Sequence, residues 1–189
     1  MAEHHVLGLS GGKDSAALAV FMRQHYPDLN IRYFFTDTGK ELPEVYDFLG
    51  RLEGFLGRPI EYLNPHRDFD FWLRQYNHFL PSAQTRWCTR KLKLEPFKYW
   101  VRPLLQAGDT VNSYVAIRAD EDHRDGMVAQ HEKLIVKFPF RDHGVDRLGQ
   151  VGGERIAGAP PLTHVLLGGL LAGHHRGAVD GLLEAVGED

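Results

Sequence analysis

The feature that most constrains this chain is a glycine-containing loop between two apolar runs near its amino end. Residues 10–15 read Ser-Gly-Gly-Lys-Asp-Ser, and they lie between the apolar stretches 6–9 and 16–22. This pattern predicts a strand, a tight turn and the first turn of a helix. Two glycines let the backbone approach a bulky anion, and the free N–H groups at the positive end of a helix dipole attract phosphate. We therefore expect a phosphate site here, formed by Ser10, Gly11, Gly12, Lys13, Asp14 and Ser15.

The segments that follow alternate between strand and helix patterns. Strands are predicted at 31–35, 60–63, 111–117 and 134–140, and helices at 15–25, 43–56 and from the basic segment to about residue 100. Such alternation predicts an α/β fold, with a doubly wound, mostly parallel sheet and helices on both faces. Eleven of the twenty glycines lie beyond residue 143. We therefore expect one domain over 1–143 and a glycine-rich tail over 144–189.

A second polar turn follows the strand predicted at 31–35. Asp37, Thr38 and Gly39 stand where this strand ends. Carboxyl ends of parallel strands meet at one edge of the sheet, so this turn should lie beside the glycine loop. Asp37 would there bind a ribose hydroxyl or a metal ion, or it would merely shape the turn, as Asp and Gly often do.

A basic segment surrounds the only cysteine. Its four cations are Arg86, Arg90, Lys91 and Lys93, and the thiol is Cys88. Neighbouring cations favour the thiolate, so Cys88 is either a nucleophile or a small buried residue. The cations form either an anion-binding surface or a solvated helix face. The aromatic residues at 69–80 precede this segment, and their helical spacing favours core packing over base stacking.

A third charged turn follows the strand predicted at 111–117. Arg118 at this strand's carboxyl end is placed to meet phosphate, and Arg124 is a further candidate contact to the substrate. Pairing of Arg118 with Asp120 or Glu121 is the competing role.

Composition sets outer limits on partners and location. The formal net charge is −3, so contact with nucleic acid would need a local patch. A single cysteine excludes an intrachain disulfide and a self-contained iron–sulfur cluster, and it suits a reducing cytoplasm. No stretch of this sequence is apolar enough to span a membrane. The chain could also form a homo-oligomer, and its composition neither favours nor excludes one.

Residues 10–15 resemble the SGGxDS loop of the ATP pyrophosphatases, the PP-loop or adenine nucleotide α-hydrolase superfamily. Two further stretches, 86–93 and 116–124, resemble the phosphoadenosine-phosphosulfate (PAPS) reductase branch, which includes the DndC-like or SspD-like subunits of DNA phosphorothioation. The resemblance implies that ATP and Mg²⁺ bind at the loop, with Asp14 as a metal contact or a helix cap. It also implies that the turn at 37–39 faces the nucleotide and that the cations near Cys88 receive substrate phosphate or sulfate.

Three functions follow from this resemblance. The first is an ATP pyrophosphatase that adenylates an acceptor for sulfur incorporation, most simply DNA, with a cysteine desulfurase and other sulfur-transfer subunits as partners; Lys13, Asp14 and Cys88 would be its catalytic residues. The second is a PAPS or adenylyl-sulfate reductase, which needs a further cysteine that is missing after Cys88. The third is a nucleotide-binding module without turnover.

Overall fold

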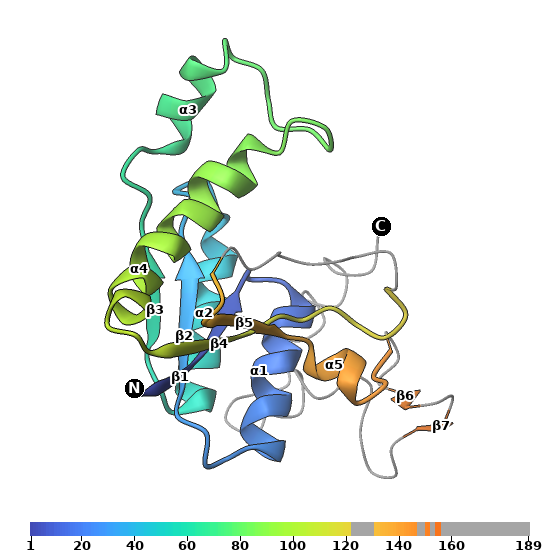
Figure 1. The fold of residues 1–189 in the computed structure, drawn as a ribbon. Coiled ribbons are helices and arrows are strands. Elements are labelled where there is room, and N and C mark those ends of the chain that lie inside the picture. The colour runs from blue at the N-terminus through green and yellow to red at the C-terminus, as the bar shows by residue number, and fades with distance from the viewer. Residues whose placement is uncertain (122–130, 147–149, 152–153, 156–189) are drawn as a thin grey trace.

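The computed structural model describes residues 1–121, 131–146, 150–151 and 154–155. Its centre is a five-stranded, all-parallel sheet in the order β3-β2-β1-β4-β5 (Figure 1). The strands are β1 (Glu3–Leu9), β2 (Ile31–Thr36), β3 (Ile60–Leu63), β4 (Thr110–Tyr114) and β5 (Leu134–Lys137). The helices are α1 (Lys13–His25), α2 (Pro43–Leu56), α3 (Phe69–Gln75), η1 (Thr89–Leu94), α4 (Glu95–Gln106) and α5 (Pro139–Asp142). A short antiparallel pair, β6 (Gln150–Val151) and β7 (Glu154–Arg155), is separate from this sheet.

Helices cover both faces of the sheet, as the alternation of strand and helix patterns predicts. Successive side chains of a strand point to opposite faces, and in β1 Leu7 and Leu9 pack with α1 and α2. Val6 points the other way and packs with Phe97 and Val101 of α4. The predicted fold class is therefore confirmed: an α/β unit with a doubly wound parallel sheet.

The strand order reverses direction at β1. The chain runs outward from β1 through β2 to β3, and α4 then returns it to β4 on the other side of β1. In open parallel sheets, ligands bind beyond the carboxyl ends of the strands where the order reverses. The fold therefore places the favoured ligand site between the segments that follow β1 and β4, which are the glycine loop and the Arg118 turn.

The aromatic segment departs from its prediction. Its helix, α3, ends at Gln75 because Asn77 and His78 adopt left-handed backbone conformations, with φ of 51° and 60°. The expectation of core packing is wrong for α3, since none of its residues is buried. The fully buried ring is instead Trp87, which stacks on Tyr76 at 5.4 Å between ring centroids.

The basic segment adopts an unusual helical form. Residues of η1 form a π-helical stretch that runs directly into α4, and π-helical turns are frequent at functional sites.

After β5, Val145 is 2% exposed within the main core, and its carbonyl accepts from the N–H of Ala119. The division near residue 143 stays a prediction, because most of the tail lies outside the described residues. Over the described part of the chain, no helix combines the length and apolarity needed to cross a bilayer.

Candidate functional site

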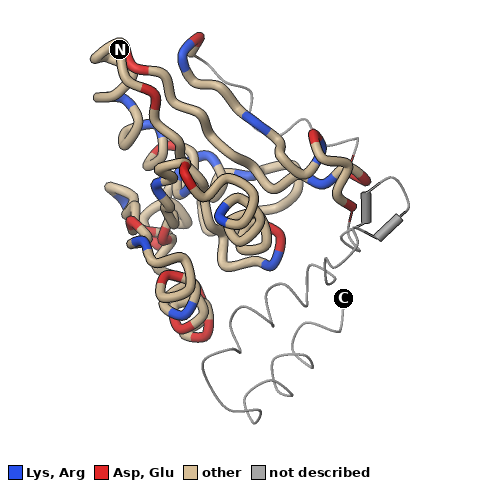
Figure 2. Tube along the Cα trace, turned by 90° about the horizontal axis from the view of Figure 1, so that it is seen from below, with Lys and Arg blue, Asp and Glu red and all other residues tan. Residues whose placement is uncertain are grey.

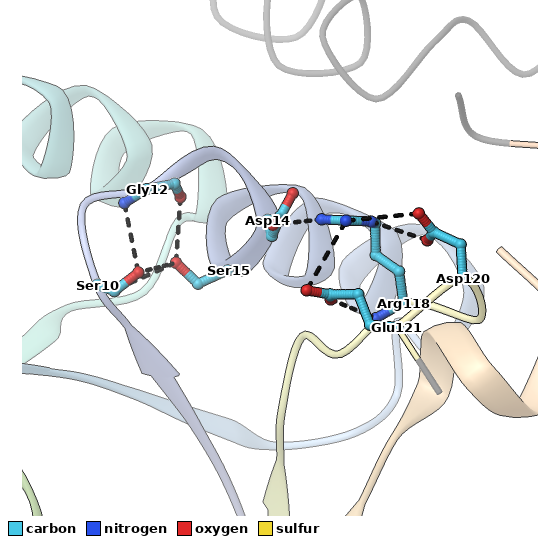
Figure 3. Close-up of polar contacts among 7 residues, drawn as sticks. All are labelled: Ser10, Gly12, Asp14, Ser15, Arg118, Asp120 and Glu121. Carbon is cyan, nitrogen blue, oxygen red and sulfur yellow. Dashed lines mark hydrogen bonds and ion pairs between the residues drawn. The ribbon is translucent and has the colours of Figure 1, made fainter. Parts of the chain in front are cut away.

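The glycine loop is held by its own two serines. Ser15 Oγ donates to the carbonyl of Gly12 at 3.1 Å and accepts from the N–H of Ser10 at 3.1 Å. The hydroxyls of Ser10 and Ser15 lie 3.0 Å apart, and the N–H of Gly12 donates to Ser10 Oγ at 3.4 Å. With Ser10 donating to Ser15, these contacts form one consistent network (Figure 3). The loop's own side chains therefore hold its backbone in this conformation.

Gly11 is required at its position for two reasons. Its φ is +75°, which L side chains rarely adopt. A Cβ built on Gly11 would also lie 2.6 Å from Cγ1 of Val45 on α2. The glycine therefore lets α2 close against the loop, which fixes where the loop lies relative to the helix.

The start of α1 leaves its first N–H groups available. Its N-cap residue is Gly12, and no side chain caps the helix there. Serine, threonine, aspartate or asparagine at this position would satisfy one of those donors, and glycine cannot. Lys13 in the first turn is exposed and makes no ion pair with any described residue. Free N–H groups at a helix start and an ammonium group beside them are features that favour an anion, and binding of phosphate at the end of β1 stays a prediction.

Arg118 joins the two segments that flank the point of strand reversal. Its guanidinium lies 2.8 Å from Asp14 of α1 and 3.0 Å from Asp120, and it is 3.7 Å from Glu121. Its side chain is only 13% exposed. Figure 3 shows the three carboxylates arranged around this one guanidinium. Burial works to lower the pKa of Arg118, but its hydrogen bond to Asp120 and the nearby negative charges raise that pKa overall.

The Arg118 contacts address two of the alternatives left by the sequence. Arg118 pairs with Asp120 and Glu121 as the competing interpretation expected, and also with Asp14, 104 positions away along the chain. Asp14 therefore does not cap α1, because its carboxylate faces Arg118. The N–H of Arg118 also donates to Glu121 Oε2, which fixes the turn.

The second turn lies beside the glycine loop, as β1 and β2 are parallel neighbours. Asp37 Oδ1 accepts from the N–H of Gly39 and from the hydroxyl of Tyr46, both at 2.8 Å. The hydrogen bond from the Tyr46 hydroxyl to Asp37, together with burial and the charge of Asp37, raises the pKa of Tyr46 to about 12. Thr38 is buried and donates to Glu41 at 3.0 Å. Asp37 thus shapes the turn, and its function toward a nucleotide stays a prediction.

The basic segment lies on a separate part of the same edge of the sheet. We call residues 64–94, between β3 and α4, the arm; Figure 1 shows α3 and the loop after it beyond the end of β2. Arg86 and Arg90 are exposed, and Lys93 and Cys88 are half-buried. The Cys88 Sγ atom lies 4.0 Å from Thr89 Oγ1. Cys88 is the N-cap residue of η1 in the arm, whereas Lys13 and Asp14 lie in the first turn of α1.

A small pocket opens between the arm and α4. Its volume is about 170 Å³, and it is lined by His66, Arg67, Trp72, Lys91, Glu95, Pro96 and Tyr99. The Lys91 ammonium lies 2.6 Å from Glu95 Oε1 and 4.6 Å from the centre of the Trp72 ring. Lys91 is predicted to contact a substrate anion. In the structure its ammonium group is already paired with the carboxylate of Glu95.

Sequence reasoning missed several of these residues. Tyr46 lies in the first turn of the helix that follows the Asp37 turn. That position is the only sequence signal that could have indicated its contact with Asp37. His66 and Arg67 follow β3 just as the other turns follow β1 and β2, so the same edge rule could have found them. Arg124 lies outside the described residues. Over those residues, no cluster of three or more histidine, cysteine or acidic side chains could hold a metal ion.

The sequence is similar to one protein-family model and to two archaeal proteins. The model of the phosphoadenosine phosphosulfate reductase domain matches residues 4–127. Two uncharacterized proteins of Methanocaldococcus jannaschii are similar in sequence. MJ0066 is 32% identical over 61% of this chain and 23% of its own length, and MJ0973 is 29% identical over 70% and 32%. The chain thus spans about a quarter to a third of these relatives.

Two solved structures are similar at low identity. A phosphoadenylyl-sulfate (PAPS) reductase from Candida auris, in complex with phosphate, is 14% identical, with a TM-score of 0.49 over 73% of this chain and 66% of its own. An NAD+ synthetase from Burkholderia pseudomallei is 16% identical, with a TM-score of 0.38 over 97% and 80%. Likenesses of this extent carry no functional argument. The family model alone covers well over half of the chain, and the chain therefore belongs to the phosphoadenosine phosphosulfate reductase domain family.

Proposed function

We propose that this chain transfers the adenylyl group of ATP to an acceptor and releases pyrophosphate, which activates the acceptor for sulfur incorporation. An acceptor oxygen would attack the α-phosphorus, and the bond between that phosphorus and the bridging oxygen would break. The observation that carries this proposal is the pairing of Asp14 with Arg118. It holds the Arg118 guanidinium, which also contacts Asp120 and Glu121, beside the uncapped start of α1, at the place where the strand order reverses.

The residues around the loop would divide the tasks of this reaction. The N–H groups at the start of α1 and the Lys13 ammonium would hold the oxygens of the departing pyrophosphate and spread its charge. Arg118 would meet a phosphate oxygen by giving up part of its contact with Asp14. Phosphoryl-group chemistry depends mainly on such positioning and charge stabilisation. The turn at residues 37–39 would contact the nucleotide beside the loop.

A magnesium ion fits this site only in part. Mg²⁺ in nucleotide enzymes is usually held by one or two carboxylates together with substrate phosphates and water. Asp14 offers one carboxylate at the loop, and the described residues contain no complete metal cluster. Asp14 would therefore hold the ion jointly with the phosphates, and the ion would supply charge neutralisation on the pyrophosphate.

The finer part of the proposal concerns the acceptor. DNA phosphorothioation is the reaction that the resemblance favours, with the cations of the arm contacting the acceptor and Cys88 acting in sulfur transfer. A cysteine desulfurase would supply the sulfur. The charge of the arm supports an anionic acceptor, because its exposed Arg86 and Arg90 have no ion-pair partner among the described residues.

A second candidate is a sulfonucleotide reductase, which the description of the family model favours. Such a reduction needs a further thiol to attack the sulfur, and these 189 residues contain Cys88 alone. Production of sulfite from adenylyl sulfate or PAPS with a reduced thiol carrier would favour this candidate over adenylyl transfer. A nucleotide-binding module without turnover would bind ATP and yield no product in either assay.

The identity of the products tests the proposal. The protein is incubated with Mg²⁺ and ATP labelled at the α or the γ position, with and without DNA, and the products are separated. AMP or adenylylated acceptor together with pyrophosphate is the expected result, and Lys13→Ala should remove it. ADP with phosphate would contradict the proposal. Arg51→Ala is a matched control, since Arg51 is an exposed cation on α2.

A further inference from the structure

Charge is distributed very unevenly along this chain. The arm holds six lysines and arginines against two aspartates, a formal charge of +4. The rest of the chain holds sixteen basic residues against twenty-three acidic ones, a formal charge of −7. Figure 2 shows lysines, arginines and acidic residues interspersed along the described chain. A local positive surface on an otherwise negative protein is the electrostatic pattern of a surface that attracts polyanions.

The acidic residues of the arm do not neutralise this charge at its surface. Asp68 is the N-cap of α3, where its side chain accepts from the N–H of Phe71 at 2.7 Å. Asp70 pairs with Lys40 at 3.0 Å, outside the arm. Neither aspartate contacts a cation of the arm. Lys91 is paired with Glu95 of α4 at 2.6 Å, so the cations most available to an incoming ligand are the exposed Arg86 and Arg90.

Aromatic side chains lie among these cations without being buried. Trp72 and Tyr99 line the pocket together with Arg67 and Lys91, and Tyr99 is 46% exposed. Phe79 at the end of the arm is 72% exposed. The arm is nevertheless ordered, because the buried Trp87 packs against Tyr76 and donates to the carbonyl of Phe79 at 3.1 Å.

We propose that the arm and its pocket bind single-stranded nucleic acid, with one base entering the pocket against Trp72 and Tyr99. Proteins of this kind combine a cationic surface that follows the backbone with aromatic rings on which bases stack. A duplex would satisfy the cations but would leave the rings without partners, because its bases are already stacked. The inference rests on the proposed function, in which the acceptor is a nucleic acid.

The pocket is suited to part of a longer ligand. Sites that enclose drug-sized ligands have volumes of about 300–1,000 Å³, so about 170 Å³ accommodates one fragment of a strand. Inside it, Lys91 and Glu95 place a donor beside an acceptor, 2.6 Å apart. Every base carries donors and acceptors on its edge, so this pair favours a base over a bare phosphate, which Glu95 would repel. The arm should therefore bind strands of many sequences.

The test measures binding of a labelled single-stranded DNA of about 12 nucleotides by fluorescence anisotropy, without ATP. Trp72→Ala should weaken binding at least about fivefold, because a stacked base loses its partner, and Trp72→Phe should retain most of the affinity. Replacing both Arg86 and Arg90 by alanine should instead reduce the salt slope of log K by about 1.4, or about 0.7 for each phosphate that the protein no longer neutralises. Arg51→Ala should change neither quantity.

Competitors separate the sources of affinity. Duplex DNA of the same sequence and inorganic polyphosphate should both compete more weakly than the single strand, and a free mononucleotide should compete only weakly. Equal competition by duplex or polyphosphate, or wild-type affinity in Trp72→Ala, would overturn the inference. This binding assay measures no turnover, so it is independent of the test of the proposed function. Strand binding without pyrophosphate formation would refute the proposed function and leave this inference standing. Pyrophosphate formation without strand binding would refute this inference and leave the proposed function standing.

Discussion

Replacement of Gly11 by alanine tests whether the geometry of the loop is as demanding as the structure indicates. A φ of +75° costs an L residue about 1–2 kcal/mol. The added Cβ would lie 2.6 Å from Val45 Cγ1, and such overpacking typically costs about 1–3 kcal/mol. Gly11→Ala should therefore lower the free energy of unfolding by about 2–5 kcal/mol, or displace the loop and abolish nucleotide binding.

Two glycines separate these contributions in the same assay. Gly39 has a φ of +72° and no atom within 4 Å of a built Cβ, so Gly39→Ala should show the backbone cost alone. Gly50 lies inside α2 with open space around it, so Gly50→Ala should stabilise by up to about 1 kcal/mol. Val45→Ala in the Gly11→Ala background should recover part of the stability. Urea denaturation measures all four; a Gly11→Ala effect no larger than that of Gly39→Ala, with ATP affinity unchanged, would refute the steric reasoning.

Three further predictions concern single side chains. Tyr46→Phe removes the hydrogen bond to Asp37 and should cost about 0.5–1.5 kcal/mol of stability in urea denaturation; no change would mean that the turn does not depend on this bond. Burial lowers the pKa of His5 in the folded chain, so the unfolded chain takes up a proton first as the pH falls below about 6.5. The wild type should then lose stability relative to His5→Gln as the pH falls through about 6.5 toward the lowered pKa of the folded state, and parallel pH profiles would contradict this. Cys88→Ser should retain pyrophosphate release while abolishing sulfur transfer; loss of both would give the thiol a part in the first step.

The parts of the site that depend on neighbouring residues could be predicted from the sequence. The glycine loop, the turn after β2 and the end of α2 at Gly57, with φ of 65°, all follow from short patterns. The pairing of Asp14 with Arg118 could not be predicted in this way, because it depends on β4 lying beside β1. Strand order is a property of the whole sheet, and local spacing carries little information about it.

The arm shows a different limit. Aromatic residues at helical spacing occur both in cores and on binding surfaces, so the pattern at residues 69–80 could not distinguish the two. What decided the outcome was the left-handed backbone at Asn77 and His78, which ends α3 and directs the chain toward Trp87. Non-glycine residues adopt that conformation only occasionally, which makes it hard to foresee.

Titration with a non-hydrolysable ATP analogue tests most directly whether the start of α1 and Arg118 form one nucleotide site. Calorimetry on the wild type should show saturable binding, and Lys13→Ala and Arg118→Gln should each weaken it about tenfold or more, as expected when a charge-assisted hydrogen bond is removed. Arg51→Ala should bind as the wild type does. No saturable binding, or unchanged affinity in both loop and turn variants, would contradict the assignment of a nucleotide site to this edge of the sheet.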